Sequence, residues 1–365
     1  MSAPSPRPPV ENVLVVGAGV AALSAALAAR TFGAEVRIVG MPRGLSHRAS
    51  GAWDAGNPAG LEVPFVHALH GLHREAQQAV LHALGGMRPL ARDASSQPLV
   101  ATQHGRLRRV ASCDERVLNL EGKKRIAIAQ VDGCDFDARA LSRAFNELDQ
   151  EPRFFVIDVE YGRRTQDALC NGSTALARSL DDESASARFT EAMRRALGGH
   201  AAEAILTPPI LGLHRNLAEV LERALKVSVG EVVAAHSIQS ERLTLKLAHA
   251  FRAIDSAWLA GRVTQRREAK RGVVLSLADG GSLIAPRLIL ATGRDAQHPE
   301  GVVVDAEACA IEGALQSSRT HYCGTLLRAL DPRLGAPLGL VAATGWWAGM
   351  CAAKRKSVTG SFDAP

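Results

Sequence analysis

The sequence predicts an α/β fold built around a parallel sheet, and three observations support this prediction. The runs Val13–Val16 and Val36–Val39 are short and rich in Val and Ile, as buried parallel strands are. The segment between them, Val20–Phe32, is rich in Ala and Leu and meets Gly33, a typical residue just beyond a helix end. A third apolar run, Leu288–Ala291, has the character of another buried strand. The order strand, turn, helix, strand predicts a βαβ unit at the start of the chain.

Length and composition indicate a globular protein of two domains. The chain has 365 residues, a net charge of +6, 47% apolar and 22% charged residues, which excludes disorder or coiled coil as its dominant state. Aromatic residues are only 4%, which argues against base-stacking surfaces, so no nucleic-acid partner is expected. The six cysteines include no C-x-x-C pair, so we expect reduced thiols, no metal site and a cytoplasmic location. The apolar run 337–353 is shorter than the roughly 20 residues that a membrane span needs.

The middle of the chain alternates between helical and extended patterns and predicts an inserted domain of α+β type. Predicted helices cover residues 67–84, 138–148, 185–197, 217–225 and 242–250, and predicted strands cover 123–130, 154–159 and parts of 263–290. Asp279–Gly281 is a strong hairpin turn. We therefore expect a disordered tail over 1–9, a discontinuous domain over 10–65 and 255–355, the inserted domain over 66–254, and a C-terminal tail over 356–365.

The turn after the first strand carries a nucleotide-binding pattern. Gly17-Ala18-Gly19-Val20-Ala21-Ala22 fits G-x-G-x-x-G/A, in which Gly17 permits a tight turn and Gly19 lets the backbone approach a pyrophosphate. The small Ala22 lets helix and strand pack closely, and a phosphate would lie at the helix N-terminus. The pattern thus predicts a Rossmann-like domain. The alternative is a glycine-rich turn that only packs a helix on a sheet.

The end of the second strand lacks the acidic residue that usually binds the adenosine ribose in such a domain. Gly40 occupies that place, followed by Met41, Pro42 and Arg43. This favours a mononucleotide such as FMN, or a 2′-phosphate of the NADP type, over NAD or ordinary FAD. Arg43 is a candidate phosphate ligand, and the alternative for it is a solvated loop residue.

Three further segments are typical of two-domain flavoproteins. The small, polar loop SHRASG, which contains Ser50 and Gly51, follows the second strand, where backbone often runs along the cofactor. The run LILATG ends in Thr292 and Gly293, as a strand returning to the nucleotide does. A helix begins near Gly339, and its N-terminus would stabilise the negative charge of a reduced flavin. The alternative for this helix is a plain core element.

Taken in order, these blocks resemble the smaller flavoprotein subunit of the anaerobic glycerol-3-phosphate dehydrogenase family. The similar pieces are VVGAGVAALSAALAARTFG, ASGAWDAG, KKRIAIAQVDGCDFDARAL, AILTPPILGLHRNLAEVLERAL, LILATG and the Asp331-Pro332 segment. The chain departs from the family in the turn GAPLG before the last helix, which keeps only part of its glycine, and in SIQSER, which replaces a Pro-rich stretch.

The resemblance implies oxidation of sn-glycerol 3-phosphate to dihydroxyacetone phosphate, with electrons passing to quinone. It implies FMN, with FAD as the alternative, and two partners: a larger flavin subunit and an iron–sulfur subunit that anchors the complex at the inner membrane. No catalytic residue is identified. The alternatives are a non-catalytic assembly subunit with a degenerate flavin site, or a flavoprotein acting on another hydroxy substrate. The candidate cofactor-binding residues are Gly17, Gly19, Ala22, Arg43, Ser50, Gly51, Thr292, Gly293 and Gly339.

Overall fold

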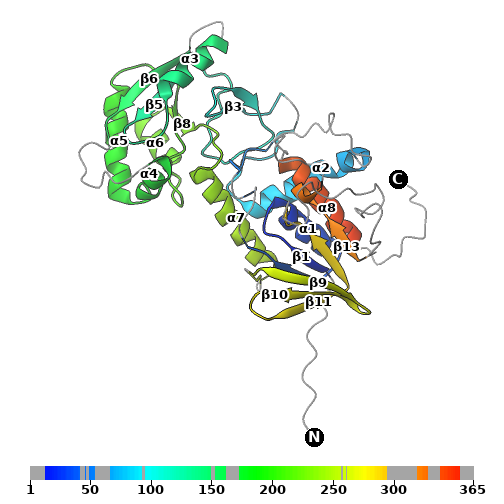
Figure 1. The fold of residues 1–365 in the computed structure, drawn as a ribbon. Helices are drawn as coiled ribbons and strands as arrows, with labels where there is room; N and C mark the ends of the chain where they lie inside the picture. Colours follow the sequence, from blue (N-terminus) through cyan, green and yellow to red (C-terminus); the bar gives the residue numbers. More distant parts are fainter. Residues whose placement is uncertain are drawn as a thin grey trace. The chain divides into compact units, whose positions relative to one another are not determined.

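The computed structural model describes two compact units of the chain (Figure 1). Unit 1 comprises Met1–Ser46, Gly56–Leu84 and Lys246–Pro365, and unit 2 comprises His47–Ala55 and Gly85–Leu245. The described residues are 13–41, 46, 49–53, 66–92, 95–148, 153–161, 172–255, 258–259, 261–293, 319–327 and 338–353, without the side chains of 66–72. Both predicted tails lie outside these ranges.

Unit 1 is built on a parallel sheet with the strand order β13-β12-β1-β2. Strand β1 (Val13–Val16) lies between β2 (Val36–Val39) and β12 (Arg287–Leu290), and β13 (Thr320–Tyr322) pairs with the far side of β12. Every residue of β1 is buried, which is why this strand is apolar throughout. Helix α1 (Val20–Thr31) connects β1 to β2, so the predicted α/β fold with its βαβ unit is confirmed.

Two helices pack with α1 in unit 1: α2 (Val66–Leu84) and α8 (Leu338–Ala353) (Figure 1). The contact between α1 and α8 is close because both helices present small residues. A Cβ built on Gly349 would lie 2.8 Å from Cβ of Ala28, and the Ser24 hydroxyl donates to the Ala342 carbonyl oxygen at 2.6 Å. Helix α2 thus belongs with α1 and α8, whereas the predicted boundary at residue 65 assigns it to the inserted domain.

A three-stranded antiparallel sheet completes the described part of unit 1. Its order is β11-β10-β9, formed by β9 (Val263–Ala269), β10 (Gly272–Leu277) and β11 (Ser282–Ala285). The turn between β10 and β11 contains Gly280 at a φ of +87°, and the Asp279 carboxylate accepts from the N–H of Gly281 at 2.9 Å. The predicted hairpin at Asp279–Gly281 is confirmed. Leu275 of this sheet shares a hydrophobic core with Leu14 of β1.

Unit 2 holds a second parallel sheet, with the order β6-β5-β7-β8. Its strands are β5 (Ile126–Val131), β6 (Phe154–Val159), β7 (Ala204–Thr207) and β8 (Ser228–Glu231). Its helices are α3 (Ala138–Leu148), α4 (Ser173–Ser179), α5 (Glu183–Leu197) and α6 (Leu217–Leu225), while α7 (Ile238–Ile254) begins in unit 2 and ends in unit 1. Because helices connect consecutive parallel strands, this unit is α/β, which differs from the α+β type expected for the inserted domain. A small antiparallel hairpin, β3 (Leu99–Ala101) and β4 (Leu107–Arg109), accompanies it.

A buried ion pair fastens the start of α7 inside unit 2. The Arg242 guanidinium donates to both carboxylate oxygens of Glu231, at 2.7 and 2.8 Å, and to the Gly212 carbonyl oxygen at 2.7 Å. Glu231 also accepts from the N–H of Leu211 at 2.6 Å and from the Gln239 amide at 3.0 Å. Both charged side chains are at most 1% exposed. Their charges are therefore fully paired away from water.

A membrane span needs a helix that is both long and apolar. Among the helices of the described ranges, none is long enough and apolar enough to cross a bilayer.

Candidate nucleotide-binding site

Four loops of unit 1 meet at the carboxyl edge of its parallel sheet. They follow β1, β2, β12 and β13, and they contain Gly17–Gly19, Gly40, Ala291–Gly293 and Cys323–Thr325. In open α/β sheets, ligands bind outside the carboxyl ends of the strands. This edge therefore collects four of the nine residues that the sequence singles out for nucleotide binding: Gly17, Gly19, Thr292 and Gly293.

Gly17 sits where only glycine fits. Its N–H donates to the Val39 carbonyl oxygen at 2.8 Å, and its φ is +146°. A Cβ built there would lie 2.8 Å from the carbonyl carbon of Ala291, closer than real Cβ contacts. The turn after β1 is thus enclosed between the ends of β2 and β12. It can be this tight because Gly17 has no side chain, as the G-x-G pattern predicts.

Gly40 explains why the acidic residue at the end of the second strand is missing. A Cβ at this position would lie 2.5 Å from the carbonyl carbon of Gly17, 2.6 Å from its oxygen and 3.0 Å from the Ala18 nitrogen. The space for a side chain is occupied by the backbone of the turn itself. Gly40 is also held in place, because its N–H donates to the Leu259 carbonyl oxygen at 3.1 Å. An acid could not enter here without moving that turn.

The N-terminus of α1 opens onto the same edge. Gly19 is the N-cap residue and has no side chain to cap the helix. The cap comes instead from Ser46, whose Oγ accepts from the N–H of Val20 at 3.1 Å. A Cβ on Gly19 would lie 2.9 Å from that Oγ. Ser46 opens the SHRASG loop but is absent from the predicted site residues; a hydroxyl shortly after the second strand is the only sequence signal that could have indicated it.

The loop after β12 lies beside the glycine turn Gly17–Gly19. The N–H of Ala291 donates to the Val16 carbonyl oxygen at 2.8 Å, and this bond holds the carboxyl ends of β12 and β1 side by side. Thr292 is exposed and its hydroxyl donates to the Gly293 carbonyl oxygen at 3.2 Å. Gly293 has a φ of +74°, and a Cβ there would lie 3.3 Å from Oγ1 of Thr325. The predicted residues Thr292 and Gly293 therefore lie at the same sheet edge as Gly17 and its turn.

The other predicted residues have different surroundings. Ala22 is completely buried in α1, as close helix packing requires. Gly339 lies in the first turn of α8, where a Cβ would be 2.9 Å from Nε2 of His73 on α2, so this glycine serves helix packing. Ser50 and Gly51 belong to unit 2, where Ser50 Oγ accepts from the N–H of Ala52 at 3.4 Å. Arg43 lies outside the described residues.

The described residues at the sheet edge of unit 1 carry no charged side chain. The described residues of its four loops, together with Ser46, include no Asp, Glu, Lys, Arg or His. The Cys323 thiol is completely buried, and burial raises its pKa to about 12, so it stays protonated at neutral pH. What the described residues of this edge offer an anion is backbone N–H groups, hydroxyls and the dipole of α1.

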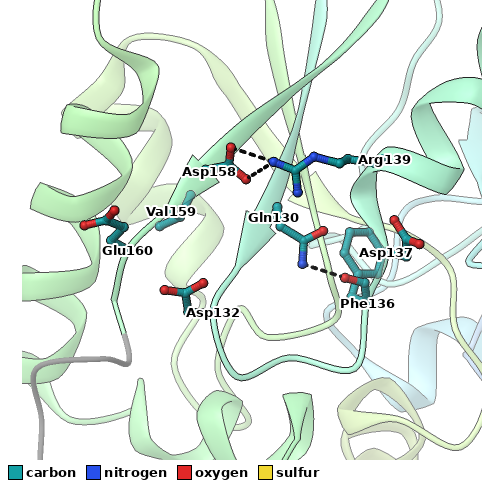
Figure 2. Close-up of a pocket in the computed structure, with 8 residues that line it drawn as sticks. All are labelled: Gln130, Asp132, Phe136, Asp137, Arg139, Asp158, Val159 and Glu160. Atoms are coloured by element: carbon teal, nitrogen blue, oxygen red, sulfur yellow. Dashed lines mark hydrogen bonds and ion pairs between the residues drawn. The ribbon is translucent and has the colours of Figure 1, made fainter.

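A separate pocket of about 510 Å³ lies in unit 2, at the carboxyl ends of β5 and β6 (Figure 2). Arg139 donates to both carboxylate oxygens of Asp158, at 2.8 and 2.9 Å, and the Gln130 side chain is tied to the Phe136 carbonyl oxygen at 2.8 Å. Its lining is mainly acidic: Gln130, Asp132, Phe136, Asp137, Arg139, Asp158, Val159 and Glu160. Excess carboxylate disfavours a phosphate. Within the described ranges, His, Cys, Asp and Glu form no group of three suited to a metal ion.

Comparisons with known proteins find no matching family model and no matching curated protein. Solved structures that align with this chain include glycine oxidase from Geobacillus kaustophilus, with 16% identity over 78% of this chain and 55% of that chain, at a TM-score of 0.31. The L-amino acid deaminase from Proteus myxofaciens has 13% identity over 80% of this chain and 48% of that chain, at 0.31. The 3-ketosteroid delta1-dehydrogenase from Sterolibacterium denitrificans has 16% identity over 80% and 48%, also at 0.31.

The chain spans about half the length of these solved proteins, at 55%, 48% and 48%.

Proposed function

We propose that this chain is a flavin-binding subunit of an oxidoreductase, with a phosphate of the flavin nucleotide bound at the N-terminus of α1. One observation carries the proposal: the glycine turn Gly17–Gly19, the strand end at Gly40 and the Thr292-Gly293 return lie together at one carboxyl sheet edge. Glycines at close backbone approaches leave room for a phosphate, and the α1 dipole favours its charge.

The residues at this edge fit a flavin nucleotide by their chemistry. A bound flavin supplies the ability to accept a hydride or electrons, and the chain's residues bind and orient it. The N–H of Val20, which donates to Ser46 Oγ in this structure, is a donor for a phosphate oxygen, and the hydroxyls of Thr292 and Thr325 lie in neighbouring loops. Since Gly40 leaves no acid for an adenosine ribose, we favour FMN and keep FAD as the alternative.

The substrate and partners follow from the family that the sequence resembles. We infer oxidation of sn-glycerol 3-phosphate, with electrons passing to quinone through a larger flavin subunit and an iron–sulfur membrane-anchoring subunit. Support comes from the order of the similar blocks, and from the lack of any C-x-x-C pair in this chain to hold an iron–sulfur cluster. The chain would act in the cytoplasm, at the inner membrane when bound to those partners.

Flavin uptake is the direct test. The purified chain should carry flavin absorbance, or should gain it on titration with FMN or FAD, and a Gly17→Ala variant should lose it because the turn cannot form. A wild-type chain that takes up neither cofactor contradicts the proposal. With the partner subunits present, glycerol 3-phosphate should reduce the bound flavin, and reduction by other alcohols instead would indicate a different hydroxy substrate.

A non-catalytic assembly subunit is the second candidate, and one observation favours it. The first turn of α8, expected to face a flavin, instead packs with Gly339 against His73 and Gln77 of α2, which are themselves hydrogen-bonded at 2.9 Å. Such a subunit would copurify with the partners and stay colourless. A yellow chain within the complex rejects this candidate.

A further inference from the structure

The hydroxyl of Ser46 occupies the position at which the proposed phosphate would bind. Ser46 lies 26 residues after Val20 in sequence, yet its Oγ accepts from the Val20 N–H at 3.1 Å. Val20 is the first residue of α1 and is completely buried, so this N–H has no access to bulk water. A buried N–H at a helix start requires an acceptor, and Ser46 is that acceptor.

The space above Gly19 leads to the same conclusion. A Cβ built on Gly19 would lie only 2.9 Å from Ser46 Oγ and 3.5 Å from Ser46 Cβ. The absence of a side chain at Gly19, which in a G-x-G turn admits a pyrophosphate, here admits the serine. A phosphate oxygen that accepts from Val20 would therefore collide with the hydroxyl in its present position.

We propose that Ser46 is an internal, displaceable cap of α1 that competes with the phosphate for the Val20 N–H. This inference rests on the proposed function and concerns how phosphate binding at the same site is regulated. When no nucleotide is bound, the hydroxyl satisfies the helix start. When a phosphate binds, it replaces the hydroxyl as the acceptor, and the serine side chain rotates away.

The competition predicts opposite effects for two substitutions of one residue. Ser46→Ala removes the competitor, so FMN should bind more tightly, by about threefold to fivefold, the factor that corresponds to one neutral hydrogen bond. Ser46→Asp places a carboxylate at the helix start, where negative charge is favoured, so it should cap α1 permanently and repel a phosphate. FMN binding to Ser46→Asp should weaken by about tenfold or more.

The test compares FMN with riboflavin, which lacks the phosphate, by titration of the purified full chain. Riboflavin affinity should be the same in wild type, Ser46→Ala and Ser46→Asp, because only the phosphate meets Ser46. Thr31→Ala is the matched control: it deletes an exposed hydroxyl at the other end of α1, bonded to the Leu27 carbonyl oxygen at 2.9 Å. Its affinities should equal those of the wild type. Weaker FMN binding by Ser46→Ala, or unchanged binding by Ser46→Asp, overturns the proposal.

Inorganic pyrophosphate and amide hydrogen exchange separate this inference from the flavin assignment. The Val20 N–H should exchange faster in Ser46→Ala than in wild type, and pyrophosphate should protect it again in both. If wild type takes up no FMN or FAD while pyrophosphate still protects Val20 and binds Ser46→Ala more tightly, the flavin assignment fails and the role of Ser46 stands. If pyrophosphate leaves Val20 exchange unchanged, the role of Ser46 fails. Unfolding temperatures of the variants show that each one is folded.

Discussion

Replacing Gly40 by alanine should disturb the proposed nucleotide site without touching any polar side chain. The added Cβ would lie 2.5 Å from the carbonyl carbon of Gly17 and 3.0 Å from the Ala18 nitrogen, whereas real Cβ atoms keep at least 3.0 Å from such neighbours. All of the opposing atoms belong to the backbone of a turn that the Gly17 N–H bond to Val39 holds at 2.8 Å. Either the turn or the end of β2 must therefore move by about half an ångström.

The size of the effect follows from overpacking. Forcing one extra carbon into a well-packed place costs about 1–3 kcal/mol, which lowers the Tm of a chain of this size by roughly 1–4 °C. Because the displaced atoms belong to the turn proposed to bind the phosphate, FMN affinity should fall by about tenfold or more, since bound geometry tolerates only about half an ångström of error. Gly40→Asp, which introduces the missing acid, should weaken FAD binding as well.

Thermal unfolding followed by circular dichroism and flavin titration by absorbance measure the two effects. Gly261→Ala is the matched control, because among the described residues a Cβ there would meet only Cγ1 of Val39, at an ordinary 3.8 Å. Its Tm and FMN affinity should stay close to those of the wild type. If Gly40→Ala behaves like Gly261→Ala, the reasoning about the strand end is refuted.

Three further predictions concern the rest of the fold. Arg242→Met leaves the buried Glu231 carboxylate without its guanidinium, so urea denaturation should show a free energy of unfolding lower by about 3–5 kcal/mol. Adding Glu231→Leu should recover most of this lost stability, and a double variant without recovery would contradict this account. Gly349→Ala places a Cβ 2.8 Å from that of Ala28 and should lower the Tm by about a few degrees in the same thermal scan, whereas an unchanged Tm would show that the helices can separate at no cost. Burial raises the pKa values of Cys113 and Cys323 to about 12, so a thiol reagent at pH 8 should label neither before unfolding. Labelling of the native chain would contradict this expectation. The stabilisation that the folded state gains by keeping these thiols protonated is complete below pH 9, the ordinary pKa of the unfolded thiol, and is lost as the pH rises from there toward 12.

Short-range patterns predict the elements well. The strands at Val13–Val16 and Val36–Val39 lie where their β-branched runs place them, and the Asp279–Gly281 hairpin turn forms as its residues indicate. Helix α1 runs over Val20–Thr31, one residue shorter than predicted. These features depend on neighbours a few residues apart, which the sequence shows directly.

Long-range contacts decide what the patterns do not show. The parallel order β6-β5-β7-β8, and the packing of α2 against α1 and α8, depend on which buried faces meet in space. Single-sequence periodicity identifies an apolar face but not the element that covers it. This is why the sequence predicts an α+β type for the inserted segment, and why the predicted boundary assigns α2 to it.

The sequence by itself determined that residues 13–39 form a βαβ unit with a glycine turn after its first strand, and that its second strand ends without an acid. Only the tertiary structure decided why the acid is missing and what caps the helix. Gly40 lies against the backbone of Gly17, and Ser46 reaches back to the N–H of Val20. Both contacts join residues more than twenty positions apart. They exist because the parallel strands bring their carboxyl ends to one edge, which no local pattern encodes.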